Sequence, residues 1–190
     1  MWSDTLYYLP GHGGRLHTGL GEALVERGWA VTGRETVGDF RAAGFQVQVD
    51  TVVQDLREHF WHPGAHVIGN SFGAYLFLHA QAQMPAYPGR VLLLSPIVGA
   101  FEDVERMQHF APPRAEHLAR LSAQGRYTPP ARCEIHVGEL DWQSVPAHVL
   151  AFAAPIGIPV TVVPGAGHML GREYVGPLLD RWLPARTPAG

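Results

Sequence analysis

The 190-residue chain contains no lysine, and all 14 of its basic residues are arginine. Schiff-base catalysis, pyridoxal-phosphate binding and the Walker-type phosphate loop each need a lysine amine, so these three kinds of site are excluded. Charge of either sign is scarce: only 16% of the residues are Asp, Glu, Lys or Arg, against about a quarter in an average soluble domain. With a formal net charge of −3 and no cluster of arginines, the chain offers no electrostatic surface for nucleic acid.

The missing charge is concentrated in two spans, residues 59–89 and 142–171, which contain no Asp, Glu, Lys or Arg. Neither span predicts a membrane helix, because Pro, Gly, Asn, Ser and His interrupt every apolar run well short of the roughly 18 residues that crossing a bilayer requires. The single cysteine, Cys133, cannot form an internal disulfide. The first residues lack the basic and apolar regions of a secretory signal. We therefore expect a cytoplasmic protein with no membrane partner.

The pattern of apolar residues predicts an alternation of strands and helices. The expected strands are 5–9, 29–32, 65–69, 90–95, 133–137 and 159–163. The expected helices are 16–27, 49–60, 72–83, 145–154 and 171–182. The remaining segments are interpreted as a loop at 33–48, an insertion at 97–130 with helical patterning at 101–109 and 114–124, and a fraying tail at 184–190.

Strands that alternate with helix-length connections predict an α/β fold: a mostly parallel sheet with helices on both faces. A chain of this length is expected to form one domain, residues 1–190. The insertion at 97–130 follows the strand that ends at Ser95. In such sheets, ligands bind beyond the carboxyl ends of the strands. The residues that follow each strand are therefore the candidate site residues.

The third predicted strand is followed by Gly69-Asn70-Ser71-Phe72-Gly73, a G-x-S-x-G pattern between strand and helix. The glycines allow a tight turn that lifts the Ser71 hydroxyl out of the sheet. The same turn places the amide of Phe72 at a helix N-terminus, aimed where an oxyanion would form. The alternative is a structural serine at a glycine-rich helix start.

Two other strand ends carry the residues that a nucleophilic serine needs. Asp141 follows the fifth predicted strand and His168 follows the sixth. We expect His168 to take the proton of Ser71 and Asp141 to orient the imidazole. The order Ser, Asp, His along the chain differs from the orders in the chymotrypsin and subtilisin folds. The other acidic residues that could take the place of Asp141 are Glu139, Glu102 and Asp103.

The first predicted strand is followed by a glycine-rich loop, residues 9–14 (L-P-G-H-G-G). Glycines here let the main chain approach the serine, so the amide of His12, or that of Gly13, would be the second oxyanion donor. A dinucleotide-binding G-x-G-x-x-G is excluded, because Leu16 occupies the third glycine position and no acidic residue ends the next strand. His59, His62 and His66 bring no Cys or carboxylate set, so no metal site is predicted.

Together these motifs resemble the α/β-hydrolase family, specifically its small single-domain members with a Ser-Asp-His triad. The resemblance spans about residues 6–182 and rests on the G-x-S-x-G turn, on residues 138–146 (G-E-L-D-W-x-x-V-P) and on residues 165–168 (G-A-G-H). The family often has one or two extra antiparallel strands before the oxyanion loop, which begins here at residue 10, so a reduced sheet of about six strands is implied. Asn70 stands where the family often has His.

The resemblance implies a serine hydrolase that cleaves a carboxylic ester through an acyl-serine, without a cofactor. Its substrate would be a small-molecule ester with a small apolar acyl or aryl group. Residues 97–130 would form a short cap of one or two helices over an open pocket. We expect this pocket to be lined by Phe72, Trp142, Met169 and Phe101. A thioesterase or acyltransferase would use the same triad, and a non-catalytic binding protein on the same fold is the alternative outside enzymes. No sequence pattern indicates an oligomeric state.

Overall fold

The computed structural model of the chain describes residues 4–184. Its main sheet has six strands in the order β2-β1-β3-β4-β7-β8, and every pair of neighbours is parallel. The strands are β1 (Thr5–Leu9), β2 (Ala30–Gly33), β3 (His66–Asn70), β4 (Arg90–Leu94), β7 (Arg132–Gly138) and β8 (Val160–Val163). A helix-containing connection joins each strand to the next, as parallel pairing requires. The predicted mostly parallel sheet of about six strands is confirmed.

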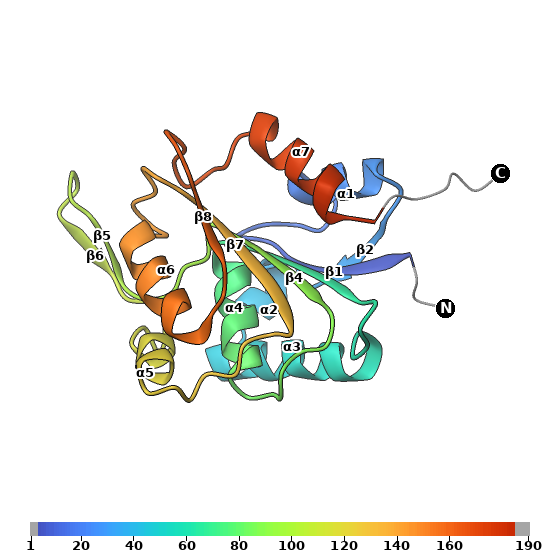
Figure 1. Cartoon of the computed structure of the whole chain (residues 1–190), viewed down its shortest axis with the longest axis horizontal. Coiled ribbons are helices and arrows are strands. Elements are labelled where there is room, and N and C mark those ends of the chain that lie inside the picture. Colours follow the sequence, from blue (N-terminus) through green and yellow to red (C-terminus); the bar gives the residue numbers. More distant parts are fainter. Residues whose placement is uncertain (1–3, 185–190) are drawn as a thin grey trace.

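Helices cover both faces of the sheet (Figure 1). One face carries α1 (Leu20–Glu26) and α7 (Arg172–Trp182). The helices below the other face in Figure 1 are α2 (Gly38–Ala42), α3 (Phe45–His59), α4 (Phe72–Gln81), α5 (His117–Ala123) and α6 (Pro146–Ala153), the last continued by a 3-10 turn at Ala154–Ile156.

The central strands β1, β3 and β4 are buried on both faces, and their side chains alternate between two hydrophobic clusters. In β1, Tyr7 and Leu9 belong to the cluster under α3 and α4, whereas Leu6 and Tyr8 belong to the cluster under α1 and α7. This alternation follows from the two-residue period of a strand. A strand enclosed in this way has no position at which a charge would face water, which explains why its sequence is a continuous apolar run.

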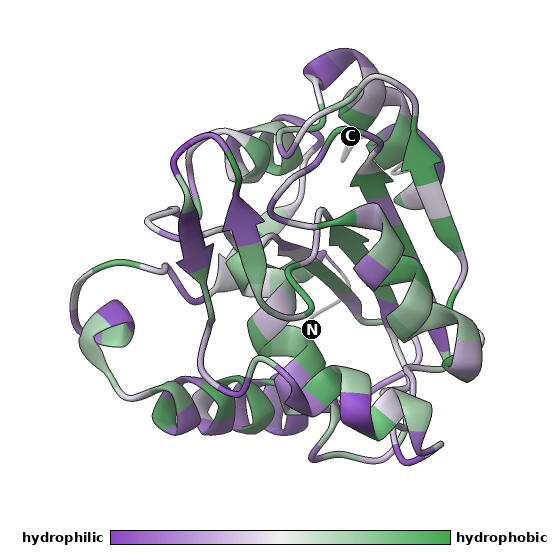
Figure 2. Ribbon diagram, turned by 90° about the vertical axis from the view of Figure 1, so that its left-hand side faces the viewer, coloured by the Kyte–Doolittle hydropathy of each residue, from purple (hydrophilic) through white to green (hydrophobic). Residues whose placement is uncertain are grey.

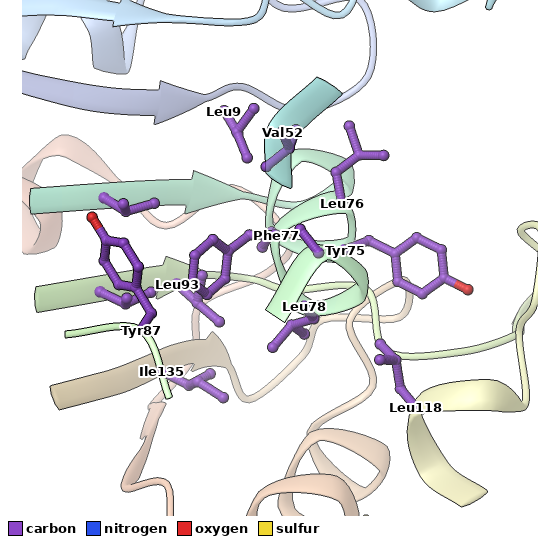
Figure 3. Close-up of a cluster of buried hydrophobic side chains, with 14 of the residues drawn as sticks. Leu9, Val52, Tyr75, Leu76, Phe77, Leu78, Tyr87, Leu93, Leu118 and Ile135 are labelled. Atoms are coloured by element: carbon purple, nitrogen blue, oxygen red, sulfur yellow. The ribbon is translucent and has the colours of Figure 1, made fainter. Parts of the chain in front are cut away.

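Helix α4 lies at the centre of the larger cluster (Figure 3). Nine of its ten residues are buried, all except Phe72. Figure 3 shows Tyr75, Leu76, Phe77 and Leu78 pointing outward from this helix toward side chains of the sheet and of the neighbouring helices. The helix lies within the first charge-free span, residues 59–89. The helix that directly follows Ser71 is therefore fixed by packing from its second residue onward.

The segment interpreted as a loop, residues 33–48, contains a helix and the start of another. Helix α2 occupies Gly38–Ala42, and α3 begins at Phe45, four residues earlier than predicted. The buried Gln48 side chain stabilises α2: its Nε2 donates to the carbonyl oxygens of Phe40 (2.8 Å), Arg41 (3.2 Å) and Ala43 (3.2 Å). A five-residue helix is too short to show a helical period, so its stability comes from this contact.

The predicted helical pattern at 101–109 is wrong: this segment is an antiparallel hairpin of β5 (Phe101–Asp103) and β6 (Gln108–Phe110). The hairpin lies to the side of the main sheet, and Figure 2 colours much of it as hydrophilic, unlike the green strands of the sheet. Cross-strand pairs hold it together: the rings of Phe101 and Phe110 stack at 5.2 Å, and Glu102 lies 3.4 Å from His109. Such pairs join residues seven or more positions apart, which a helical period does not detect.

The insertion at 97–130 thus contributes one hairpin and one short helix, α5, within the region predicted as 114–124. The fraying tail predicted for 184–190 lies outside the described residues from position 185 onward. Among residues 4–184, no helix combines the length and the apolar character needed to cross a bilayer.

Two buried histidines have strongly lowered pKa values. His79 lies in α4, where burial and the neighbouring His117 lower its pKa from the ordinary 6.5 to about 3. His66 lies in β3, where burial and the charge of Arg90 lower its pKa to about 4. Both side chains are therefore neutral in the folded protein at pH values where they are protonated in the unfolded chain.

We predict that the fold loses stability in mild acid because of these histidines. A lowered folded-state pKa means that the stabilisation is complete above the unfolded pKa of 6.5 and is lost as the pH falls toward the folded value. The loss at pH 5 should be about 2 kcal/mol from His79 alone. Urea unfolding of the wild type and of His79→Leu at pH 8 and pH 5 measures this decrease in the free energy of unfolding. The decrease should be about 2 kcal/mol smaller in the variant than in the wild type. Equal losses would contradict the prediction.

Candidate active site

Ser71 occupies a strained turn between β3 and α4. Its backbone has φ 51° and ψ −114°, in a region that side-chain-bearing residues rarely adopt. The turn is fixed from both sides: the Ser71 amide donates to the Leu94 carbonyl (2.9 Å), and its carbonyl accepts from the Tyr75 amide (3.1 Å). Surrounding hydrogen bonds of this kind are what sustain backbone strain at a functional position.

The two glycines of the G-x-S-x-G pattern are required by close backbone contacts. A Cβ on Gly73 would lie 2.0 Å from the Leu9 carbonyl oxygen, at the end of β1. A Cβ on Gly69 would lie 2.9 Å from Cα of Ala74. The first contact brings β1, and hence the loop after it, beside the N-terminus of α4. The second contact allows the chain to pass from β3 into α4 through a tight turn.

Ser71, His168 and Asp141 form a continuous chain of hydrogen bonds. Ser71 Oγ lies 2.8 Å from His168 Nε2, and His168 Nδ1 lies 2.9 Å from both carboxylate oxygens of Asp141. A carboxylate only accepts, so Nδ1 carries the proton and Nε2 is left to accept from the serine hydroxyl. Three strand-end loops that are far apart in sequence thus place their predicted residues in contact.

Backbone amides fix the orientation of Asp141. Its Oδ1 also accepts from the amides of Gln143 (2.9 Å) and Ser144 (2.8 Å). The Ser144 hydroxyl donates in turn to the Pro96 carbonyl at 2.5 Å, which ties this turn to the chain after β4. The Asp141 side chain has no exposed surface. The carboxylate is therefore held in one position, facing the imidazole.

The three alternative acids have other partners. Glu139 accepts from the Gly165 amide at 2.8 Å and so holds the loop that carries His168. The other two belong to the hairpin: Glu102 faces His109, and Asp103 lies 3.5 Å from Arg106. None of these three hydrogen-bonds to His168 within residues 4–184, whereas Asp141 does.

Gly138 is a residue of the site that sequence reasoning missed. It ends β7, and a Cβ there would lie 2.2 Å from the Gly167 carbonyl oxygen. The loop of Asp141 and the loop of His168 therefore pack backbone against backbone, joined by a hydrogen bond of 2.8 Å from the Leu140 amide to the Ala166 carbonyl. The signal in the sequence is a glycine at the last position of a strand whose following loop carries a site residue.

Two free backbone amides lie near Ser71, one in the loop after β1 and one at the start of α4. A Cβ on Gly11 would lie 3.3 Å from Cβ of Ser71, so the loop runs directly beside the serine. Of the two predicted donors in this loop, the Gly13 amide is already bonded to the Thr36 carbonyl at 3.2 Å. In the described part of the chain, the amides of His12 and Phe72 donate to no acceptor, as expected of Phe72 in the first turn of a helix.

Thr36 was not identified from the sequence, yet it holds this loop in place. Its Oγ1 donates to the Gly11 carbonyl and accepts from the Gly14 amide (3.0 Å). Its backbone amide donates to the Gly14 carbonyl (3.1 Å), and its carbonyl accepts from Gly13. The residue is buried and lies in the segment interpreted as a loop. No local pattern reveals it, because its partners are more than twenty positions away.

Two cavities lie beside the hydrogen-bonded chain. The first, of about 260 Å³, is called the aromatic cavity here; its walls include His12, Thr36, Phe40, Arg41, Phe45 and Phe72. The second, of about 640 Å³, is called the α1–α7 cavity; its walls include Glu22, Arg27, Asn70, His168, Met169 and Arg172. The serine turn lies between them, since Asn70 and Phe72 flank Ser71 and each faces a different cavity.

The four side chains expected to line one pocket are in three places. Phe72 lines the aromatic cavity and Met169 lines the α1–α7 cavity. Phe101 and Trp142 pack against each other, with ring centroids 5.8 Å apart, and both contact Phe110 of the hairpin. Among residues 4–184, no group of three or more His, Cys, Asp or Glu side chains is placed to hold a metal ion.

Comparison with known proteins relates this chain to others by fold rather than by sequence. No family model matches it, and no curated protein does. The α/β hydrolase domain-containing protein 10 from mouse superimposes with a TM-score of 0.64 at 13% identity, over 94% of this chain and 90% of that one. The Paleococcus ferrophilus monoacylglycerol lipase gives 0.60 at 14%, over 93% of each chain. The ydeN gene product from B. subtilis gives 0.63 at 14%, over 94% and 98%.

We predict that Gly73→Ala destabilises the protein by about 3 kcal/mol or more, because the new Cβ would overlap the carbonyl of Leu9. The matched control is Gly64→Ala, whose Cβ would meet nothing nearer than His62 Nδ1 at 3.5 Å, an ordinary contact. The control should stay within about 0.5 kcal/mol of the wild type. Urea and thermal unfolding measure both, and equal stability of the two variants would refute the close contact.

Proposed function

On the α/β-hydrolase fold that this chain has, we propose that it is a serine hydrolase that cleaves carboxylic esters through an acyl-serine intermediate. The observation that carries the proposal is the hydrogen-bonded chain from Ser71 through His168 to Asp141, with two free amides beside the serine. A binding protein would have no use for all of these groups together. A fold neighbour that is a monoacylglycerol lipase supports an ester as the substrate.

Ser71 is the nucleophile of the proposed reaction. Its Oγ attacks the ester carbonyl carbon while His168 Nε2, 2.8 Å away, takes the hydroxyl proton. Asp141 keeps the Nδ1 proton in place and stabilises the imidazolium that forms. The bond from the carbonyl carbon to the leaving oxygen then breaks, and His168 returns the proton to that oxygen. A water molecule repeats the sequence on the acyl-serine, which releases the acid and restores Ser71.

The amides of His12 and Phe72 stabilise the oxyanion in this proposal. Both are close to Ser71, and neither has an acceptor in the described part of the chain, so both are available to the negative charge on the carbonyl oxygen. The Phe72 amide is also at the N-terminus of α4, where the helix dipole favours an anion. Each such donor contributes about 3–4 kcal/mol to lowering the barrier.

We predict that Ser71→Ala lowers kcat/KM for p-nitrophenyl esters by about 10³-fold or more and leaves the protein folded. A fluorophosphonate should label the wild type at Ser71 and should not label this variant. The matched control is Ser95→Ala, because Ser95 also follows a strand, is buried and has positive φ, here 43°. It should keep full activity. Unchanged turnover in Ser71→Ala would end the proposal.

The same assay, run with a panel of substrates, tests whether the proposed enzyme prefers carboxylic esters to thioesters. The panel consists of p-nitrophenyl esters and acyl thioesters of graded acyl length, each scored by kcat/KM. The proposal expects the highest values among the short esters. Efficient turnover of thioesters alone, or transfer of the acyl group to an added alcohol in preference to water, would replace the ester hydrolase with another reaction of the same acyl-serine.

Thr36 is a positioning residue in this proposal, since it acts only through the oxyanion loop. We predict that Thr36→Val, which keeps the shape of the side chain and removes the hydroxyl, lowers kcat by about 10- to 100-fold with a smaller change in KM. Thr36→Ser keeps the hydroxyl and should recover most of the activity. If the valine and serine variants are equally impaired, the hydroxyl has no positioning role.

A further inference from the structure

The two cavities beside Ser71 receive different halves of the substrate, and this assignment rests on the proposed function. His168 gives its proton to the leaving oxygen, so the leaving group must depart next to the imidazole. His168 lines the α1–α7 cavity. The aromatic cavity is lined instead by His12 and Phe72, the residues whose amides face the oxyanion. It is therefore placed to take the other substituent of the carbonyl carbon, the acyl chain.

The charges around the two cavities differ. The α1–α7 cavity is lined by both signs, with Glu22 and Glu26 against Arg27 and Arg172. The aromatic cavity is lined by one charged side chain, Arg41, and by no acidic residue. Among residues 4–184, Arg41 forms no ion pair, whereas Arg27 is bound to Asp180 at 2.7 Å. The aromatic cavity thus has one uncompensated positive charge.

The field of this arginine reaches into the cavity. Burial, and after it the charge of Arg41, lower the pKa of His12, which lines the same cavity. His12 is accordingly neutral near pH 7, so a ligand in this cavity meets one cation and several aromatic rings. A single guanidinium balances the single charge of a carboxylate and can bind both of its oxygens with paired N–H groups.

The backbone that carries Arg41 is held in position. Gln48 Nε2, from α3, donates to the carbonyl oxygens of Arg41, Phe40 and Ala43 at 2.8 to 3.2 Å. The Gln48 side chain is buried beneath the cavity wall. Helix α2 is thereby fixed to α3, with Phe40 and Arg41 both at the cavity. The backbone that carries these two cavity residues is therefore held in a fixed position.

We propose that the aromatic cavity binds an acyl group that ends in a carboxylate, so that the substrate is a half-ester of a short dicarboxylic acid. The apolar part of the acyl chain would lie against the rings of Phe40, Phe45 and Phe72, and its carboxylate would pair with Arg41. A volume of about 260 Å³ limits this group to a short chain or one ring. Hydrolysis then yields the free alcohol, which leaves by way of the α1–α7 cavity, and the dicarboxylate.

The first test compares two p-nitrophenyl esters of equal shape, the glutaric half-ester and its terminal amide. The wild type should show a kcat/KM at least about 10-fold higher for the carboxylate, the effect of one charged hydrogen-bonded pair. Arg41→Gln should remove this preference, so that the kcat/KM values for the carboxylate and for the amide become equal in the variant. The matched control, Arg172→Gln in the other cavity, should keep the preference.

The second test measures binding without turnover. Isothermal titration calorimetry compares 4-phenylbutyrate with 4-phenylbutyramide on the wild type and on Arg41→Gln. The carboxylate should bind at least about five-fold more tightly to the wild type, and the two ligands should bind equally to the variant.

The two proposals fail in different ways. If Ser71 is labelled and neutral esters are hydrolysed, but neither assay shows a preference that depends on Arg41, the carboxylate site is overturned and the hydrolase stands. If binding depends on Arg41 but Ser71 is neither labelled nor active, the hydrolase is overturned and the carboxylate site stands.

Discussion

The close approach between the end of β1 and the first turn of α4 is the constraint on which the site depends. It exists because Gly73 has no side chain: a Cβ there would lie 2.0 Å from the Leu9 carbonyl oxygen. The contact brings the loop after β1 beside Ser71, so that this loop and the N-terminus of α4 lie next to the same serine. The strained φ of 51° at Ser71 is sustained by the hydrogen bonds of its amide and carbonyl and by the helix that follows, which is buried from Gly73 onward. Close backbone contacts, together with the hydrogen bonds of Thr36, thus hold Ser71 and both amides in place.

The scarcity of charge has its explanation in the same packing. The span 59–89 contains β3, Ser71 and α4, and the span 142–171 contains α6, β8 and His168, all of which lie in or against the two buried clusters. An unpaired charge in these elements would have to be removed from water at a cost of several kcal/mol. Asp141, at the border of the second span, is the buried carboxylate that is tolerated there. It is tolerated because two backbone amides and His168 bind its oxygens.

Features that are encoded by neighbouring residues could be predicted from the sequence, whereas features that depend on partners elsewhere in the chain could not. Strands show a run of apolar residues and a glycine or polar residue at their ends, so all six strands of the main sheet were predicted to within a residue or two. Because the carboxyl ends of parallel strands share one edge, the meeting of Ser71, Asp141 and His168 was predictable as well. Helix α2, the hairpin and Thr36 were not, since each depends on a distant partner: the Gln48 amide, the Phe101–Phe110 pair and the glycine loop after β1.

The chemistry and the choice of substrate rest on different kinds of structure. Ser71, Asp141 and His168 follow the ends of three strands of the main sheet, β3, β7 and β8. Phe40 and Arg41 belong instead to a five-residue helix, which is held chiefly by the side-chain amide of Gln48. A substitution at Arg41 therefore alters the wall of the aromatic cavity without moving the serine turn. A change at Gln48 would instead release that whole wall, since three carbonyls lose their donor at once. The substrate preference proposed for this protein thus depends on the segment between β2 and α3, whereas the proposed chemistry depends on the strand ends.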